Sequence, residues 1–214
     1  MATIEFSEDN AVDTVIPIFR LKPEQTHDNM LEKIISHYGN WDEAEEFIIS
    51  ANLRSLDHTY GASIAHFKKG THIPTAVQLP HFTPMMKALE ESSDIEIIEV
   101  EVIPGVSKTG EAPKLCKGDI LHMGLLSTEP ESQQNLVDTL QKTLIQQIQS
   151  AEGLESITVH RSRDGNKVIV IGLWTDAASA QAAAVSPGWQ QADEFLGPLV
   201  KSKEFKIFEV VLVR

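Results

Sequence analysis

Hydrophobic and polar residues alternate along two similar stretches of the chain, residues 50–67 and 154–174. In each stretch, two apolar runs flank a short polar segment, which contains Asp57 in the first and Asp164-Gly165 in the second. Apolar runs on either side of Asp-Gly are a strong signal for a β-hairpin, because glycine accepts the positive φ that a tight turn requires. The pattern therefore predicts two hairpins.

The segments around each hairpin follow the same order. Apolar spacing in the first half predicts a strand over 14–21, a helix over 23–38, a helical turn over 41–47, the hairpin, a helix over 82–89 and a strand over 95–103. In the second half it predicts a strand over 119–126, a helix over 132–150, the hairpin, helical pieces over 177–185 and 189–196, and a strand over 205–213. Each half therefore reads β-α-β-β-α-β, the ferredoxin-like arrangement.

The two halves can be aligned as an internal repeat. The alignment places Asn52 on Thr158, Phe67 on Trp174 and Phe82 on Trp189, with His160 as one extra residue in the second half. Both faces of the run over 168–174 are apolar, so both faces of its sheet need covering. We expect an α+β fold in which two ferredoxin-like repeats cover each other and form an eight-stranded pseudo-dimeric barrel with the helices outside.

This reading divides the chain into four parts. Residues 1–11 form a tail, 12–103 the first repeat, 104–117 a linker rich in Gly, Pro and polar residues, and 118–214 the second repeat.

Charge and cysteine content narrow the choice of partner and compartment. The 214 residues carry a formal net charge of −13, which argues against nucleic acid or an anionic membrane as a partner. The single cysteine, Cys116, allows no intrachain disulfide and fits a reducing compartment, and no apolar run reaches the roughly 20 residues that span a bilayer. We expect a cytoplasmic protein.

Polar residues within the predicted hairpin strands are the candidates for chemistry. Asn52 stands in an apolar strand, where it either faces a ligand or is held by neighbouring backbone. Thr158 and His160 share one strand face, and His160 either removes a phenolic proton in a pocket or lies exposed near the turn. His122 could face the same pocket, but no third ligand is evident, so we predict no metal site.

Large apolar side chains supply candidate walls for an aromatic substrate. Either they line a pocket or they fill the core; the candidates are Trp174, Trp189, Phe67, Phe82 and Met85.

Two segments resemble the antibiotic biosynthesis monooxygenase superfamily of dimeric α+β barrels. They are Ser-Ala-Asn-Leu-Arg-Ser-Leu-Asp at 50–57, followed by the strand to Phe67 and by Pro-His-Phe at 80–82, and Gly-Leu-Glu-Ser-Ile-Thr-Val-His-Arg-Ser-Arg-Asp-Gly at 153–165, followed by Trp174 and Ser-Pro-Gly-Trp at 186–189. The resemblance covers both halves of the chain.

The resemblance implies a cofactor-independent monooxygenase that uses O2 on an aromatic or polyketide-like substrate. In quinone-forming members a strand Asn and a nearby Trp bind the substrate enolate, and these positions correspond to Asn52 in the first half and Trp174 in the second. The alternative is a barrel of the same family that binds a ligand, acts like a cyclase or has a structural role. The residues leave homodimerisation open, and we expect the pocket in the second half.

Overall fold

The computed structural model describes residues 2–6, 12–37, 44–72, 78, 80, 82–186 and 195–214, with backbone alone for 104 and 144–149. The first half contains β2 (Val12–Leu21), α1 (His27–Ser36), β3 (Phe47–Ser55), β4 (Tyr60–Lys68), α4 (Thr83–Ser92) and β5 (Ser93–Ser107). The second contains β7 (Ile120–Ser127), α5 (Gln133–Ser150), β8 (Leu154–Ser162), β9 (Lys167–Trp174), α6 (Ala177–Ala184) and β10 (Ser202–Val213). The predicted β-α-β-β-α-β order is present in each half.

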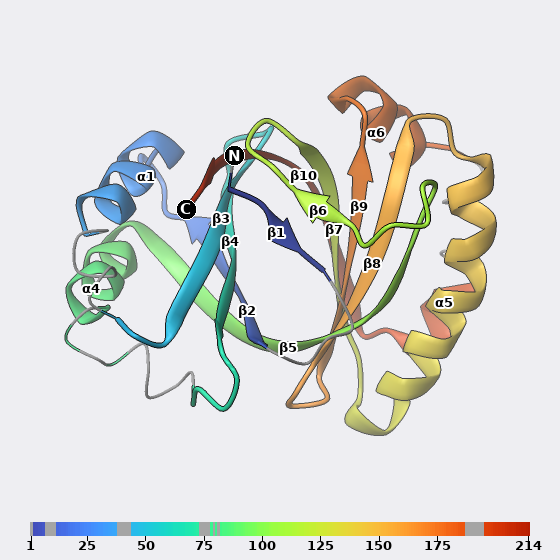
Figure 1. Ribbon diagram of the computed structural model, residues 1–214, viewed down its shortest axis with the longest axis horizontal. Coiled ribbons are helices and arrows are strands. Elements are labelled where there is room, and N and C mark those ends of the chain that lie inside the picture. The colour runs from blue at the N-terminus through green and yellow to red at the C-terminus, as the bar shows by residue number, and fades with distance from the viewer. Residues whose placement is uncertain are drawn as a thin grey trace.

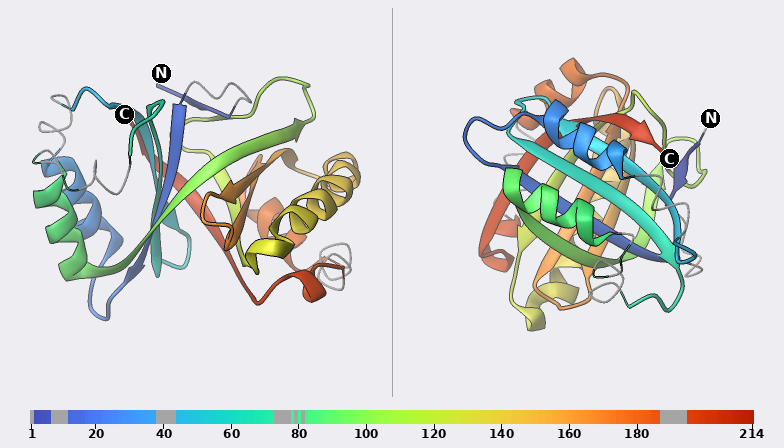
Figure 2. Two further views of the ribbon diagram at one scale, coloured as in Figure 1. Left: turned by 90° about the horizontal axis from the view of Figure 1, so that it is seen from below. Right: turned by 90° about the vertical axis from the view of Figure 1, so that its left-hand side faces the viewer.

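Eight strands close into one barrel in the order β10-β3-β4-β2-β5-β8-β9-β7 (Figure 1). Within each half the first strand lies between the last strand and the hairpin, as in a ferredoxin-like sheet. The halves join where β5 pairs with β8 and where β10 pairs with β3, both antiparallel. Figure 2 shows the helices of the two halves on opposite outer sides of the barrel. The predicted α+β pseudo-dimeric barrel is therefore confirmed.

The strand registers show which residues of the two halves are equivalent. Strands β2, β3 and β4 of the first half correspond to β7, β8 and β9 of the second, with 107 added to each residue number. Thr14 pairs with His66, and Leu121 pairs with Leu173, so both members of the second pair are 107 positions further along the chain. The hairpins follow the same shift, because each has its register irregularity at the matching place, Phe47/Ile49 in β3 and Leu154/Ser156 in β8.

This shift corrects the alignment expected from the sequence. The pair Asn52–Ser63 corresponds to the pair Val159–Val170, so the counterpart of Asn52 is Val159 and not Thr158. A slip of one residue along a strand moves every side chain to the other face of the sheet. The extra residue of the second half therefore precedes the hairpin and is not His160.

Three apolar clusters fill the molecule. One occupies the barrel interior and includes Ile16, Ile64, Leu121 and Ile171. The other two lie between each half of the sheet and its helices: Phe19, Met30 and Leu89 belong to the first half, and Leu136, Val159 and Trp174 to the second. Both faces of the sheet are thus buried, as the continuous apolar runs require.

The tail and the linker meet over the barrel. Strand β1 (Ile4–Glu5) pairs with β6 (Lys114–Leu115), and Ile4 and Phe6 belong to the cluster inside the barrel. The segment expected as a linker, 104–117, holds the end of β5 as well as β6. Of the helical turn predicted over 41–47, residues 41–43 lie outside the described part of the chain, and the end is wrong because Phe47 starts β3. Among the described residues, no helix is both long and apolar enough to cross a membrane.

Candidate functional site

A pocket lies between the sheet of the first half and its helices α1 and α4. Its cavity volume in this structure is small, about 50 Å³. Its lining residues come from β2, β3, β4, β5, α1, α4 and the residue before α4: Val15, Pro17, Phe19, Ile34, Asn52, Ser63, Ala65, Phe67, Phe82, Met85, Met86, Leu89 and Ile97. Buried apolar clefts with few polar groups are typical of small-molecule sites.

Asn52 and Ser63 are the two polar residues in this lining. They face each other across the β3–β4 hairpin, and their exposed fractions are 2% and 6%. The Ser63 hydroxyl donates a hydrogen bond to the backbone oxygen of Ala51 over 3.1 Å, which fixes its orientation. The pocket therefore offers one amide and one hydroxyl against apolar walls.

Aromatic and sulfur-containing side chains form one wall of the pocket. The rings of Phe67 and Phe82 meet edge to face with their centroids 6.0 Å apart, and Phe47 contacts Phe67 in the same manner at 5.8 Å. Met85 is buried beside them. The structure thus brings together four of the residues chosen from the sequence, Asn52, Phe67, Phe82 and Met85.

In the second half, the positions that match the polar pair carry Val159 and Val170, which are buried in the core between sheet and helices. Trp174 lies in the same core with an exposed fraction of 2%, and its Nε1 has no hydrogen-bond partner among the described residues. The pocket described here is accordingly in the first half, whereas the sequence favoured the second.

His122 and His160 lie on opposite faces of the sheet. His122 contacts the ring of Phe205, which packs against the core between sheet and helices, while His160 contacts Phe6 of the cluster inside the barrel. The expectation that the two histidines face one pocket is therefore wrong. Burial lowers the pKa of His122 to about 4 and that of His160 to about 3, so both are neutral at pH 7 and are weak bases there.

The remaining candidates are divided between the barrel interior and undescribed segments. Thr158 lies beside His160 in the barrel, 3.0 Å from its Nε2, and so does not reach the pocket of Asn52. Trp189 lies outside the described residues. Ser63 was not among the candidates chosen from the sequence. The register of the β3–β4 hairpin, which pairs Ser63 with Asn52, is the signal that could have identified it.

No group of three or more metal-ligating side chains gathers in the part of the chain that the structure describes. Among the described residues that line the first-half pocket, none has a titratable side chain.

Comparison with known proteins finds one family model and several solved structures that this chain resembles. Residues 120–194 match the family model described as antibiotic biosynthesis monooxygenase. The structure of an anthrone oxidase-like protein superposes with a TM-score of 0.81 at 15% identity, covering 100% of this chain and 96% of that one. No curated protein sequence gives a significant match.

Two bacterial structures have the same fold. A putative monooxygenase from Fusobacterium nucleatum superposes with a TM-score of 0.62 at 9% identity, over 95% of this chain and 94% of that one. A ferredoxin-fold protein from Listeria monocytogenes, described as related to antibiotic biosynthesis monooxygenases, gives 0.55 at 11% identity, with 97% of each chain covered. At these identities the likeness shows the fold alone. Residues 120–194 are thus similar to the antibiotic biosynthesis monooxygenase family, as the resemblance in the sequence predicted, and the solved structures share the α+β barrel fold.

Proposed function

We propose that this protein is a cofactor-independent monooxygenase that oxidises an aromatic, polyketide-like substrate with O2 in the first-half pocket. The observation that carries the proposal is the polar pair of Asn52 and Ser63 in an otherwise apolar lining. In this proposal the side chains of the pocket move apart to admit a flat ring, which packs against Phe67 and Phe82 while the polar pair holds an oxygen of that ring.

The reaction we propose converts an anthrone-type methylene to a quinone carbonyl. Loss of one proton gives the enolate, whose carbon forms a bond to O2 as electrons pass from the enolate to oxygen. Breaking the O–O bond leaves one oxygen atom as the new carbonyl, and the other departs as water with the two methylene hydrogens. The Asn52 amide would donate a hydrogen bond to the enolate oxygen, a role for which fixed amide donors are suited.

The pocket limits which substrates can react. Because none of the described lining residues can titrate, the proposal favours substrates that lose their first proton readily near neutral pH, as anthrones and activated phenols do. His160 is excluded from this step by its place inside the barrel.

The test is oxygen uptake by the purified protein with 1,8-dihydroxy-9-anthrone as the probe, corrected for uptake without protein. We expect quinone formation with one O2 consumed for each anthrone. Converting the polar pair to the pair that the second half carries, Asn52→Val with Ser63→Val, should lower the rate by about 100-fold, the scale of losing a fixed oxyanion donor.

The matched control is Val159→Ala with Val170→Ala, which changes the corresponding pair of the second half. It should leave the rate within about twofold once the folded fraction is equal. No uptake above the protein-free rate with any anthrone or phenol would overturn the proposed oxygenase function.

A second candidate is a barrel that binds the same class of molecule without oxidising it. The absence of a titratable group from the lining of the described pocket favours this alternative. It predicts that the anthrone binds under anaerobic conditions, that Asn52→Val weakens binding, and that admitting O2 produces no catalysed uptake.

The proposal also includes a small molecule rather than a nucleic acid as the partner, and a cytoplasmic location. The net charge of −13 supports the first, and the single cysteine supports the second. Light scattering of the purified chain would decide between a monomer and a homodimer.

A further inference from the structure

The apolar interior of the barrel contains two buried histidines. His66 projects from β4 and His160 from β8, with exposed fractions of 7% and 0%. His160 Nε2 lies 3.0 Å from the hydroxyl of Thr158. Within the described residues, however, His66 Nε2 and His160 Nδ1 have no hydrogen-bond partner. Buried polar atoms in proteins are rarely left in this state.

The fold itself does not require these histidines. The shift of 107 residues places Leu173 opposite His66 in the repeat, and Leu53 opposite His160. In each half, therefore, leucine fills the position at which the other half has histidine. Burying an imidazole with an unpaired nitrogen is less favourable than burying leucine, so packing alone gives no reason for either histidine.

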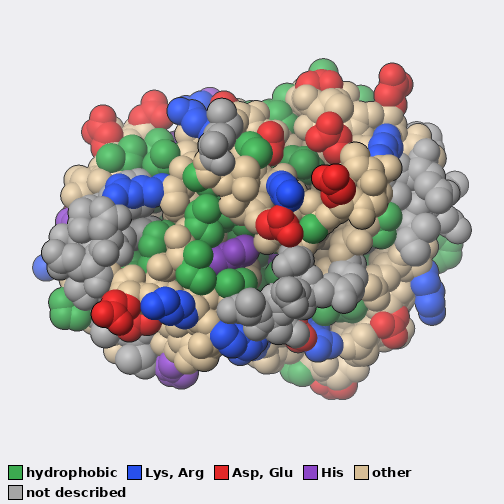
Figure 3. Space-filling model, in the orientation of Figure 1, with side chains coloured by type: hydrophobic (Ala, Val, Ile, Leu, Met, Phe, Trp, Pro, Cys, Tyr) green, Lys and Arg blue, Asp and Glu red, His purple; other side chains and the backbone are tan. Residues whose placement is uncertain are grey.

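The ring of Phe6 contacts both histidines. It meets His66 edge to face with the centroids 6.5 Å apart, and meets His160 in the same way at 5.1 Å. Phe6 follows β1, which together with β6 lies across the space enclosed by the barrel strands (Figure 1). On this face of the molecule, a histidine is visible among hydrophobic side chains between the two halves (Figure 3).

Few polar contacts hold this covering strand in place. The Phe6 amide donates to the Pro113 carbonyl over 2.9 Å, and Glu5 forms a half-exposed ion pair with Lys114 at 3.4 Å. The β1–β6 ladder has two residue pairs. The strand is held chiefly by its buried side chains, and an occupant that replaces the Phe6 ring would restore much of that packing.

We propose that the barrel interior is a second ligand site, which takes an uncharged phenol whose ring replaces that of Phe6 and whose hydroxyl hydrogen-bonds to His66 or His160. The ring has the shape of the side chain it displaces, and the hydroxyl supplies the partner that the imidazole nitrogens lack. The apolar surroundings exclude a charged ligand. This site is on the opposite face of the sheet from Asn52, and the inference does not depend on the proposed oxygenase function.

Both imidazoles are in the form that such a ligand needs. Burial lowers the pKa of His66 to about 4 and that of His160 to about 3. At pH 7 each ring is therefore neutral, with one nitrogen able to donate a hydrogen bond and the other able to accept one.

The test is a titration of the whole chain, labelled with ¹⁵N-histidine, with phenol at pH 7. We expect the imidazole nitrogen resonances of His66 or His160 to shift on binding. Phe6→Ala should bind phenol at least tenfold more tightly, because the ligand no longer has to displace the ring. His66→Leu with His160→Leu, which installs the residues of the opposite half, should bind phenol at least tenfold more weakly than the wild-type chain.

Two controls make the outcome decisive. Asn52→Val should not change phenol's effect on the histidine resonances, and benzene should bind the leucine variant as well as it binds the wild type. Unshifted histidine resonances in the wild-type chain would overturn the proposal, and binding to Phe6→Ala alone would show only a cavity made by truncation. The proposal would also be overturned if the wild-type chain and the double leucine variant bound phenol with equal affinity. The single variants His66→Leu and His160→Leu are measured in the same way.

Discussion

A serine and an aspartate two residues later close both hairpins in the same way. The Ser55 hydroxyl donates to Asp57 over 2.7 Å and accepts from the Tyr60 amide over 2.9 Å. In the second half, the Ser162 hydroxyl donates to Asp164 over 2.6 Å and accepts from the Lys167 amide over 2.8 Å. The Ser-x-Asp sequence that occurs in both hairpins is thus explained by turn geometry.

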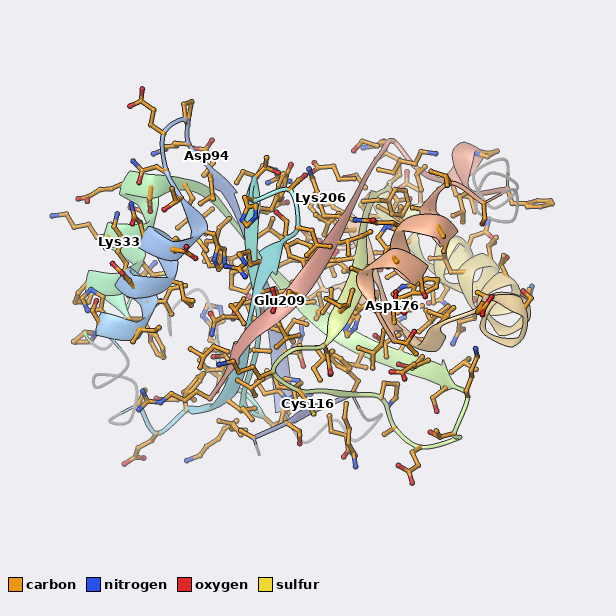
Figure 4. The ribbon with its side chains drawn as sticks, turned by 90° about the horizontal axis from the view of Figure 1, so that it is seen from above. Lys33, Asp94, Cys116, Asp176, Lys206 and Glu209 are labelled. Atoms are coloured by element: carbon orange, nitrogen blue, oxygen red, sulfur yellow. The ribbon has the colours of Figure 1, made fainter. Side chains whose placement is uncertain are left out.

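The two aspartates differ in one contact, which gives a prediction. Asp57 also accepts a hydrogen bond from Lys206 of β10, a strand of the other half that Figure 4 shows crossing the molecule. Burial would raise the pKa of Asp57, but the hydrogen bonds from Lys206, Thr59 and Ser55 outweigh it and hold the pKa well below its usual range. This carboxylate therefore stabilises the fold above the unfolded-state pKa near 4, and the contribution is lost as pH falls below that value.

We expect Asp57→Asn to lower the free energy of unfolding by about 1 kcal/mol at pH 7, a figure already reduced for the partial exposure of the group. The loss should shrink below pH 4, because the carboxylate of the unfolded chain takes up a proton there while that of the folded protein stays ionised. Urea unfolding at pH 7 and pH 3 measures both values. Asp164→Asn, which has no contact with β10, is the control, and an equal loss in the two variants would contradict the role given to Lys206.

At the scale of strands and helices, the sequence predicted order and pairing but not which face each side chain takes. Helical spacing and turn residues identify the elements because these signals are local. The face of a strand is decided by register, and in this barrel both faces are apolar, so a one-residue error leaves the hydrophobic pattern intact. Placing the extra residue at His160 instead of before β8 therefore moved Thr158 and His160 to the wrong face.

The same reasoning shows why the site was predicted only in part. Asn52, Phe67, Phe82 and Met85 are polar or bulky residues that stand out in the sequence. Ser63 does not stand out, because it acquires its place only through pairing with Asn52 across the hairpin.

Strand β5 depends on a glycine at the point where it crosses from one half to the other. Its register against β8 shifts between Ile103 and Val106, and a Cβ on Gly105 would lie 2.6 Å from the backbone oxygen of Ile157. That oxygen belongs to the sheet and cannot move aside cheaply. We expect Gly105→Ala to lower the free energy of unfolding by about 2 kcal/mol, as measured by urea denaturation.

Gly197→Ala is the matched control, since a Cβ there would meet none of the described atoms within 4 Å. It should change stability by less than about 0.5 kcal/mol. A similar effect of the two substitutions would show that the close approach at Gly105 is relieved by movement of the strand.

For the whole molecule, the two halves are held together by sheet pairing and by a shared interior. Strand β5 pairs with β8, and β10 with β3, while the cluster inside the barrel draws Ile16 and Ile64 from one half and Leu121 from the other. A half on its own would leave two strand edges and one apolar sheet face exposed. We therefore propose that the repeats over 12–103 and 118–214 are structural units and that neither is stable as a monomer without the other.

Cutting the chain after Gly110 tests this proposal, because the exposed loop there lies between β5 and β6 and no pairing of the barrel crosses it. Co-expressed fragments 1–110 and 111–214 should form a one-to-one complex, detected by light scattering coupled to gel filtration, because the β5–β8 and β10–β3 pairs and the interior cluster can all re-form. Expressed alone, each fragment should self-associate through the same edges, with 111–214 forming a dimer in which β10 of each copy pairs with β8 of the other. A fragment that is monomeric, with sharp cooperative unfolding, would show instead that one half contains its own sufficient core, and the barrel would then be two independent domains in contact.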